Sequence, residues 1–130
     1  MLSVIIPTYN RADILKQCLE RLACQQGVDF EVIVVDDGST DRTSEVCNEF
    51  LQEPWFRYLK QDHSQQGVAR NRGAAVAQAD FLVFIGDDIL AEPDFLWKHF
   101  EIHLQHPEEN VVGLGYTTWA PSLPINDYMK

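Results

Sequence analysis

The sequence has few basic residues and no long apolar segment. It carries 10 lysine and arginine residues against 20 aspartate and glutamate residues, for a formal net charge of -10 over 130 residues. This balance argues against a nucleic-acid-binding protein and against attachment to a membrane through a basic surface, because both need clustered positive charge. No apolar run approaches the roughly 20 residues of a membrane-spanning helix, so we expect no membrane segment in the chain.

Cysteine is also scarce. Cys18, Cys24 and Cys47 include no pair at CxxC spacing, which is typical of reduced, partly buried thiols and not of a disulfide framework or a metal centre. The N-terminal stretch lacks a basic flank and a cleavage site, so it is typical of a strand and not of a signal peptide. We therefore predict a cytoplasmic protein.

What the chain does contain is a regular alternation of short apolar runs with helical patterns. This alternation is typical of βαβ units, and right-handed crossovers then give an open, doubly wound, mostly parallel α/β sheet with helices on both faces. A chain of 130 residues is expected to form one domain. The strands are predicted over residues 2–6, 31–35, 56–60, 81–85 and 111–115, with Asn10 and Asp13 as a capping pair for the first helix.

Three of these strands end in polar segments: residues 7–10 (Pro-Thr-Tyr-Asn), 36–39 (Asp-Asp-Gly-Ser) and 86–88 (Gly-Asp-Asp). In open α/β sheets, ligands bind outside the carboxyl ends of the strands. The GxGxxG, GxxxxGK[ST] and GxSxG motifs are all absent, so none of the common nucleotide loops or nucleophile turns accounts for these segments. We expect a ligand site where the three segments meet.

Asp87 and Asp88 follow the most apolar strand. Two adjacent carboxylates repel each other, so they need a counter-charge. Mg²⁺ or Mn²⁺ is a natural one, because such ions take one or two carboxylates and complete their shell with phosphate and water. The alternative is that the pair caps the following turn or faces solvent.

Asp36 and Asp37 have a similar position but precede Gly38, Ser39 and Thr40. These residues favour a tight turn, in which one of the two aspartates is structural. The other carboxylate could accept hydrogen bonds from a nucleobase or a ribose. Tyr9, at the neighbouring strand end, could stack on that base, a contact worth ~1–3 kcal/mol, or be an ordinary core or rim aromatic.

Arg70 and Arg72 are candidate ligands for an anion in this acidic chain. Helical spacing points the two side chains about 200° apart, so only one of them is expected to face the site. A surface salt bridge is the alternative for either residue.

Four segments together resemble the family-2 glycosyltransferases of GT-A fold. They are residues 3–11 (SVIIPTYNR), 32–41 (VIVVDDGSTD), 67–73 (GVARNRG) and 84–88 (FIGDD), and their order and spacing fit the family through about residue 95. The resemblance implies a nucleoside diphosphate sugar, such as a UDP- or GDP-sugar, bound with Mg²⁺ or Mn²⁺. By the same resemblance, Pro7, Tyr9 and Asp37 line the nucleobase pocket, Asp87 lies near the ribose or sugar, Asp88 binds the metal, and Arg70 or Arg72 approaches the diphosphate.

The sequence departs from the family pattern in two respects. Gly86 stands where the DxD motif commonly has its first aspartate. Family catalytic domains also continue well beyond 130 residues, and their second half carries the acceptor site and the general base. We therefore expect residues 1–130 to be the donor-binding part of a domain truncated at its C-terminus, with the base beyond residue 130. Apolar residues 111–116 and Trp119 would then favour self-association into a homo-oligomer.

The expected reaction is an inverting, metal-assisted transfer of the sugar to an acceptor hydroxyl. The leading alternative is a non-catalytic nucleotide-sugar-binding module that lacks the acceptor half. A receiver-like signalling domain is disfavoured, because the third strand ends in Lys60, Gln61 and Asp62, outside any acidic trio. A sugar nucleotidyltransferase is disfavoured because no glycine-rich nucleotide loop follows the first strand.

Overall fold

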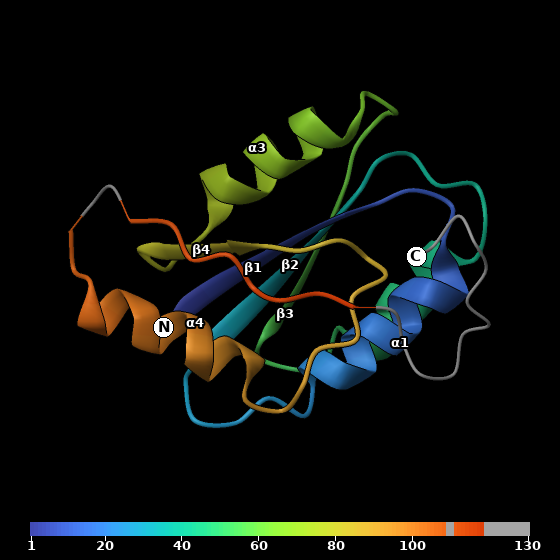
Figure 1. Ribbon diagram of the computed structural model, residues 1–130. Helices are drawn as coiled ribbons and strands as arrows, with labels where there is room; N and C mark the ends of the chain where they lie inside the picture. The colour runs from blue at the N-terminus through green and yellow to red at the C-terminus, as the bar shows by residue number, and fades with distance from the viewer. Residues whose placement is uncertain (109–110, 119–130) are drawn as a thin grey trace, which may run out of the picture.

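Strands and helices alternate through the chain in this computed structural model, which describes residues 1–108 and 111–118 (Figure 1). The predicted alternation is therefore observed over these residues. The elements in chain order are β1 (Leu2–Thr8), α1 (Ala12–Leu22), β2 (Phe30–Asp36), α2 (Thr43–Phe50), β3 (Phe56–Lys60), α3 (Gln66–Val76), β4 (Phe81–Phe84) and α4 (Phe95–Gln105).

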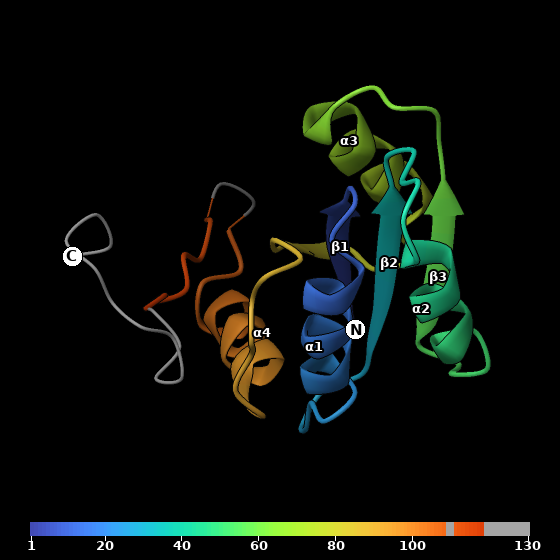
Figure 2. The same cartoon turned by 90° about the vertical axis from the view of Figure 1, so that its right-hand side faces the viewer.

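The four strands form one parallel sheet in the order β3-β2-β1-β4. β1 lies inside the sheet, with Val4 paired to Val32 of β2 on one side and to Val83 of β4 on the other. All seven residues of β1 are buried, as expected of a strand covered on both faces. Figure 2 shows β1, β2 and β3 pointing the same way. The predicted α/β fold class is confirmed.

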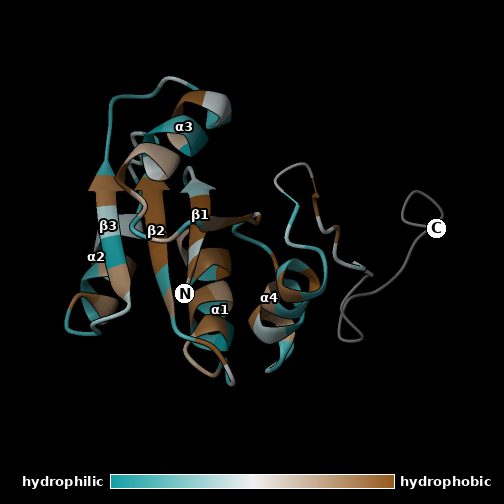
Figure 3. Cartoon of the chain, turned by 90° about the vertical axis from the view of Figure 1, so that its left-hand side faces the viewer, coloured by the Kyte–Doolittle hydropathy of each residue, from teal (hydrophilic) through white to brown (hydrophobic). Residues whose placement is uncertain are grey.

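Helices cover both faces of the sheet. Val32 and Val34 belong to the core shared with α1, α2 and α4, whereas Ile33 and Val35 pack against Ala69 of α3. This alternation follows from the two-residue period of a strand. In Figure 1, α3 lies above the sheet and α1 and α4 lie below it, and Figure 3 shows that hydrophobic residues predominate in the strands.

The structure overturns the prediction of a strand over residues 111–115. No strand is formed by residues 111–118, and Val112, Leu114 and Tyr116 are each at least 90% exposed. The segment instead passes α4, where Gly113 lies against Ile102. Apolar sequence alone does not make a strand, because its backbone groups also need a partner strand. Trp119, predicted to contribute to the same apolar surface, lies outside the described residues.

None of the helices within residues 1–108 and 111–118 combines the length and the apolar character that crossing a membrane requires.

Candidate functional site

The parallel strands bring their carboxyl ends to one edge of the sheet. The backbone N–H of Asp37, just beyond β2, donates to the carbonyl of Thr8 at the end of β1, at 2.9 Å. The Thr8 hydroxyl donates to Asp87, just beyond β4, also at 2.9 Å. Three of the strand ends that the sequence marked as polar therefore meet in direct contact.

The loops that follow β1 and β2 are joined by further hydrogen bonds at this edge of the sheet. The Asn10 side-chain oxygen accepts hydrogen bonds from the backbone N–H groups of Thr40 and Asp41, at 2.7 and 3.3 Å. Asp41 in turn accepts from the N–H of Ala12, the first residue of α1, at 3.1 Å. The prediction that Asn10 caps α1 is thus wrong, because its side chain is engaged by the loop after β2. These bonds hold the loop that carries Tyr9 against the loop after Asp37.

Asp36 is the structural member of its pair. Its carboxylate is fully buried and accepts the N–H of Ser39 at 2.9 Å, which closes the turn after β2. The same carboxylate accepts the hydroxyl of Tyr58 at 2.5 Å. Both bonds are internal to the fold, so Asp36 has no free side facing a ligand.

Asp37 is 3% exposed and receives donors on both carboxylate oxygens. Its Oδ1 accepts from the Gln61 amide at 2.9 Å and from the N–H of Ser64 at 2.7 Å. Its Oδ2 accepts from the N–H of Gln65 at 2.9 Å and pairs with Nδ1 of His63 at 3.0 Å. Burial alone would raise the pKa of Asp37, but the hydrogen bonds from Gln61, Ser64 and Gln65 outweigh burial and lower it.

Tyr9 is 41% exposed, and it shares one neighbour, His63, with Asp37. The imidazole of His63 packs on the Tyr9 ring, with centroids 4.3 Å apart and planes tilted by 33°. Pro7 precedes this aromatic as a buried residue of β1, paired with Val35. The structure thus links Tyr9 and Asp37 through His63, and Pro7 lies two residues before Tyr9 near the end of β1.

Asp87 is 5% exposed and bound by two donors. Thr8 donates to its Oδ2, and the guanidinium of Arg11 lies 3.0 Å from its Oδ1. Burial is the largest influence on the pKa of Asp87 and raises it, helped by the nearby charge of Asp88 and opposed by Thr8 and Arg11. Arg11 also lies 3.7 Å from the carboxylate of Asp88.

Arg11 is therefore a counter-charge for the aspartate pair, a role the sequence analysis assigned to a metal ion. Sequence reasoning overlooked Arg11 although it stands three residues beyond β1, at the same sheet edge. Asp88 nevertheless keeps an accessible carboxylate, with a side chain that is 56% exposed. The side chain of Asp88 lies over Gly86, where an added Cβ would be 2.7 Å from Oδ1 of Asp88.

This donor set fits Mg²⁺ or Mn²⁺ bound together with a phosphorylated ligand. No group of three His, Cys, Asp or Glu residues suited to a metal occurs within residues 1–108 and 111–118. Such a cation needs only one or two protein carboxylates when phosphate and water supply the other oxygens. The exposed oxygens of Asp88, beside the buried Asp87, meet that requirement.

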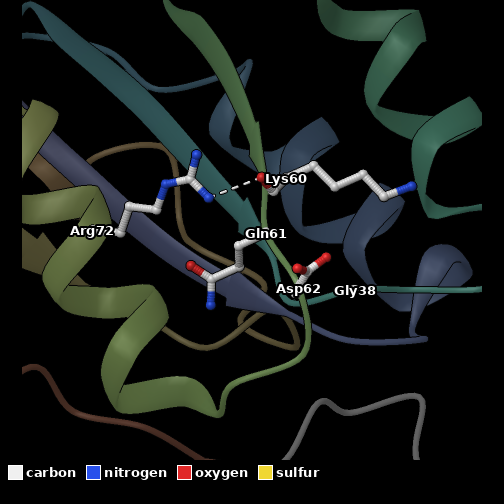
Figure 4. Close-up of a pocket in the computed structure, with 5 residues that line it drawn as sticks. All are labelled: Gly38, Lys60, Gln61, Asp62 and Arg72. Atoms are coloured by element: carbon white, nitrogen blue, oxygen red, sulfur yellow. Dashed lines mark hydrogen bonds between the residues drawn. The ribbon is translucent and has the colours of Figure 1, made fainter.

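Arg70 and Arg72 leave α3 in different directions, as their spacing predicts. Arg72 donates to the carbonyl of Lys60 at 2.8 Å, whereas Arg70 contacts Gln66 within its own helix at 3.3 Å. Arg72 also lines an open pocket of about 560 Å³ that includes the turn residue Gly38 (Figure 4). Arg72 thus lies near the turn that contains Gly38, whereas Arg70 is exposed on α3 and contacts only that helix among the hydrogen bonds of the described residues.

A parallel α/β sheet with helices on both faces is a Rossmann-like fold, a class in which ligands bind at the carboxyl edge of the sheet. The model of glycosyl transferase family 2 matches residues 3–119 of the chain. The chain belongs to this family.

Individual relatives agree with this assignment. The chain is 43% identical over 115 residues to a PGL/p-HBAD biosynthesis glycosyltransferase of Mycobacterium bovis, covering 86% of this chain and 45% of that protein. It superimposes on S. aureus TarS 1-349 in complex with UDP-GlcNAc with a TM-score of 0.76 at 26% identity, covering 88% of this chain and 37% of that one. It superimposes on the mannosyltransferase PcManGT of Pyrobaculum calidifontis, in complex with GDP-Man and Mn2+, with a TM-score of 0.63 at 25% identity, covering 67% and 27%.

The chain spans less than half the length of the curated relatives that it matches. The similarity therefore concerns one part of those proteins.

Proposed function

We propose that this chain is the donor-binding part of a glycosyltransferase and that it binds a nucleoside diphosphate sugar, with UDP or GDP as the nucleotide, for transfer to an acceptor hydroxyl. The observation that carries the proposal is the meeting of Tyr9 and Asp37 with the Asp87–Asp88 pair at one sheet edge, in a member of this family. The relatives crystallised with UDP-GlcNAc and with GDP-Man support the choice of ligand class.

Each side chain has a distinct role in this proposal. Tyr9 stacks on the nucleobase, Pro7 shapes the floor of the pocket, and Asp37 accepts a base N–H. Asp87 faces the ribose or the sugar. An arginine of α3, Arg70 or Arg72, stabilises the negative charge of the diphosphate.

Asp88 would hold Mg²⁺ or Mn²⁺, a proposal supported by its accessible carboxylate and by the Mn2+ in the mannosyltransferase complex. A cation bound there supplies Lewis-acid stabilisation of the charge on the leaving diphosphate. In this account Asp88 transfers no proton. Arg11 keeps Asp87 and Asp88 close together by balancing part of their charge.

We propose that transfer inverts the anomeric centre, because a single displacement by the acceptor oxygen is the simplest course. It requires a carboxylate base that accepts the acceptor's proton. We assign that base and the acceptor site to sequence beyond residue 130, since the chain spans under half of its relatives.

One observation favours a second candidate function. The chain covers 29% and 45% of two of its glycosyltransferase relatives. A chain that holds the donor pocket without the acceptor site would act as a nucleotide-sugar-binding module. Incubating the purified chain with UDP-GlcNAc or GDP-mannose separates the two functions. Release of free sugar or transfer to an added acceptor supports the enzyme, and binding without turnover supports the module.

Calorimetric titration with UDP and with GDP, each with and without Mn²⁺, tests donor binding. One nucleotide should bind more tightly when Mn²⁺ is present. Asp88→Ala should reduce that affinity to the level measured without the metal, because it removes the carboxylate that we assign to the cation. Asp80→Ala is a matched control: Asp80 is an exposed aspartate just before β4, so this variant should keep the metal effect.

Equal affinity of the wild type and Asp88→Ala in Mn²⁺ would overturn the metal assignment. No affinity for either nucleotide would overturn the donor site.

We also propose that the protein is cytoplasmic. The support is that Cys18, Cys24 and Cys47 are all free thiols, two of them buried.

A further inference from the structure

The acceptor positions of Asp37 are fully used by its own chain. Its Oδ1 accepts two hydrogen bonds, from Gln61 and Ser64, and its Oδ2 accepts one from Gln65 and pairs with His63. A carboxylate has about four acceptor sites. A base N–H can therefore reach Asp37 only after one of these four donors has left.

His63 is the donor that can leave most readily. Its side chain is 58% exposed, whereas two of the other three donors are backbone N–H groups of the same loop. The His63 backbone packs closely on Gly38, where an added Cβ would be 2.9 Å from the His63 nitrogen. Rotation of the imidazole into solvent thus frees one site on Asp37 without moving the loop.

The same imidazole covers Tyr9. Carbon atoms in contact are about 3.5–4.0 Å apart, so rings with centroids 4.3 Å apart leave no room for a base between them. When His63 leaves, it exposes a face of Tyr9 and one oxygen site of Asp37 together. A nucleobase, which is a flat ring with an N–H at its edge, would use both the Tyr9 face and the Asp37 oxygen. The imidazole of His63 is also a flat ring with an N–H at its edge.

We propose that His63 occupies the nucleobase position and must be displaced when the donor binds, so that it sets donor affinity. This inference rests on the proposed function. The loop that carries His63 is well held, since Gln65 keeps its N–H on Asp37 at the cost of a left-handed φ of 98°. Displacement of His63 therefore involves its side chain, while the backbone of the loop stays bonded to Asp37.

The edge of the imidazole resembles that of a base in its hydrogen bonding as well. Nδ1 of His63 lies 3.0 Å from both Oδ2 and the carbonyl oxygen of Asp37. Both oxygens are acceptors, so Nδ1 carries the hydrogen and donates it to Asp37, as the N–H of a bound base would.

The test uses the full chain, His63→Ala and the control His106→Ala, a change of an exposed histidine after α4. Affinities for UDP-GlcNAc and for GDP-mannose, in Mn²⁺, are measured by calorimetry. If the occluding form is populated at about 90%, His63→Ala should bind about tenfold more tightly than the wild type. His106→Ala should match the wild type.

NMR of the histidine ring protons provides a second measurement. Donor addition should shift the signals of His63 as its ring leaves Tyr9. The inference is overturned if donor binds while His63 signals stay in place, or if His63→Ala binds donor more weakly than the wild type. If neither the wild type nor His63→Ala binds either donor, the proposed function itself fails, and this outcome is distinct from the two that overturn the inference.

Discussion

At the scale of single residues, the site sets two aspartates in opposite electrostatic environments. Asp37 and Asp87 are both nearly fully buried. Hydrogen bonds from Gln61, Ser64 and Gln65 outweigh burial at Asp37 and lower its pKa, whereas burial dominates at Asp87 and raises its pKa. Asp37 is thereby kept as an anion that accepts hydrogen bonds, whereas at Asp87 burial raises the pKa against the opposing effects of Thr8 and Arg11.

The lowered pKa of Asp37 predicts how stability responds to acid. A carboxyl whose pKa is lower in the folded state stabilises the protein above its unfolded-state pKa of about 3.9, and that contribution is lost as pH falls through the folded-state value. Asp37→Asn should thus cost about 1–3 kcal/mol of unfolding free energy at neutral pH. The cost should shrink below about pH 4.

Urea unfolding at neutral pH and at about pH 3 measures this difference. Asp62→Asn, a change of an exposed neighbour in the loop, is the control and should stay within about 0.5 kcal/mol of the wild type at both values. A cost for Asp37→Asn that does not change with pH would contradict the prediction.

The sequence was informative about which residues end the strands and much less so about what those residues touch. Tyr9, Asp37 and Asp87 could be placed at one edge, because parallel strands share a direction. The partners His63 and Arg11 could not, since they depend on how loops close after β3 and β1. The capping role predicted for Asn10 failed for the same reason, as Asp41 from another loop bonds to the start of α1.

At the scale of elements, the packing of α3 depends on one close approach. A Cβ on Gly73 would lie 2.6 Å from the side chain of Ile5 and 3.3 Å from that of Val35, whereas a Cβ on Gly67 would have no neighbour within 4 Å. Both glycines belong to the same helix. α3 can therefore lie against the sheet only because residue 73 has no side chain.

Gly73→Ala should lower the unfolding free energy by about 1–3 kcal/mol, because the helix or Ile5 must shift to admit the methyl group. Gly67→Ala should be neutral or stabilise the protein by up to about 1 kcal/mol through helix propensity. Thermal and urea unfolding of the two variants provide the comparison. Equal effects at the two positions would show that the helix does not need this approach.

The strand predicted over residues 111–115 shows where the apolar sequence pattern led to a wrong prediction. Residues 111–115 have the apolar, β-branched character of the strands, yet they lie beside α4 without pairing. The buried strands were predictable because burial and pairing coincide in them. Residues 111–115 have the composition of a strand, but no strand among the described residues pairs with them.

At the scale of the whole molecule, the described chain exposes apolar side chains near α4. Val112, Leu114 and Tyr116 are almost fully exposed, and Leu104 and Trp97 are partly so. Exposed apolar groups gathered in this way favour association. The proposal that the chain is part of a longer domain accounts for them, since further sequence could cover this side.

The chain should therefore self-associate as its concentration rises. Replacing Val112 and Leu114 by serine should weaken association, because it removes the most exposed aliphatic side chains. Sedimentation velocity at several concentrations measures the change. Leu51→Ser is the control, as Leu51 is exposed after α2. A wild-type chain that stays monomeric throughout would contradict the prediction.

The order of the strands in the sheet determines which part of the site unfolds locally at the lowest free energy. Within residues 1–108 and 111–118, β4 is four residues long and pairs only with β1, whereas β1 is fully buried between two neighbours. Short edge strands with few contacts open at lower free energy than central ones. Fraying of β4 would release Asp87 and Asp88 while Tyr9 and Asp37 stayed assembled on β1 and β2. Amides of β4 should exchange with deuterated solvent before those of β1, so the proposed contacts to the metal and the diphosphate would be lost before the proposed contacts to the base.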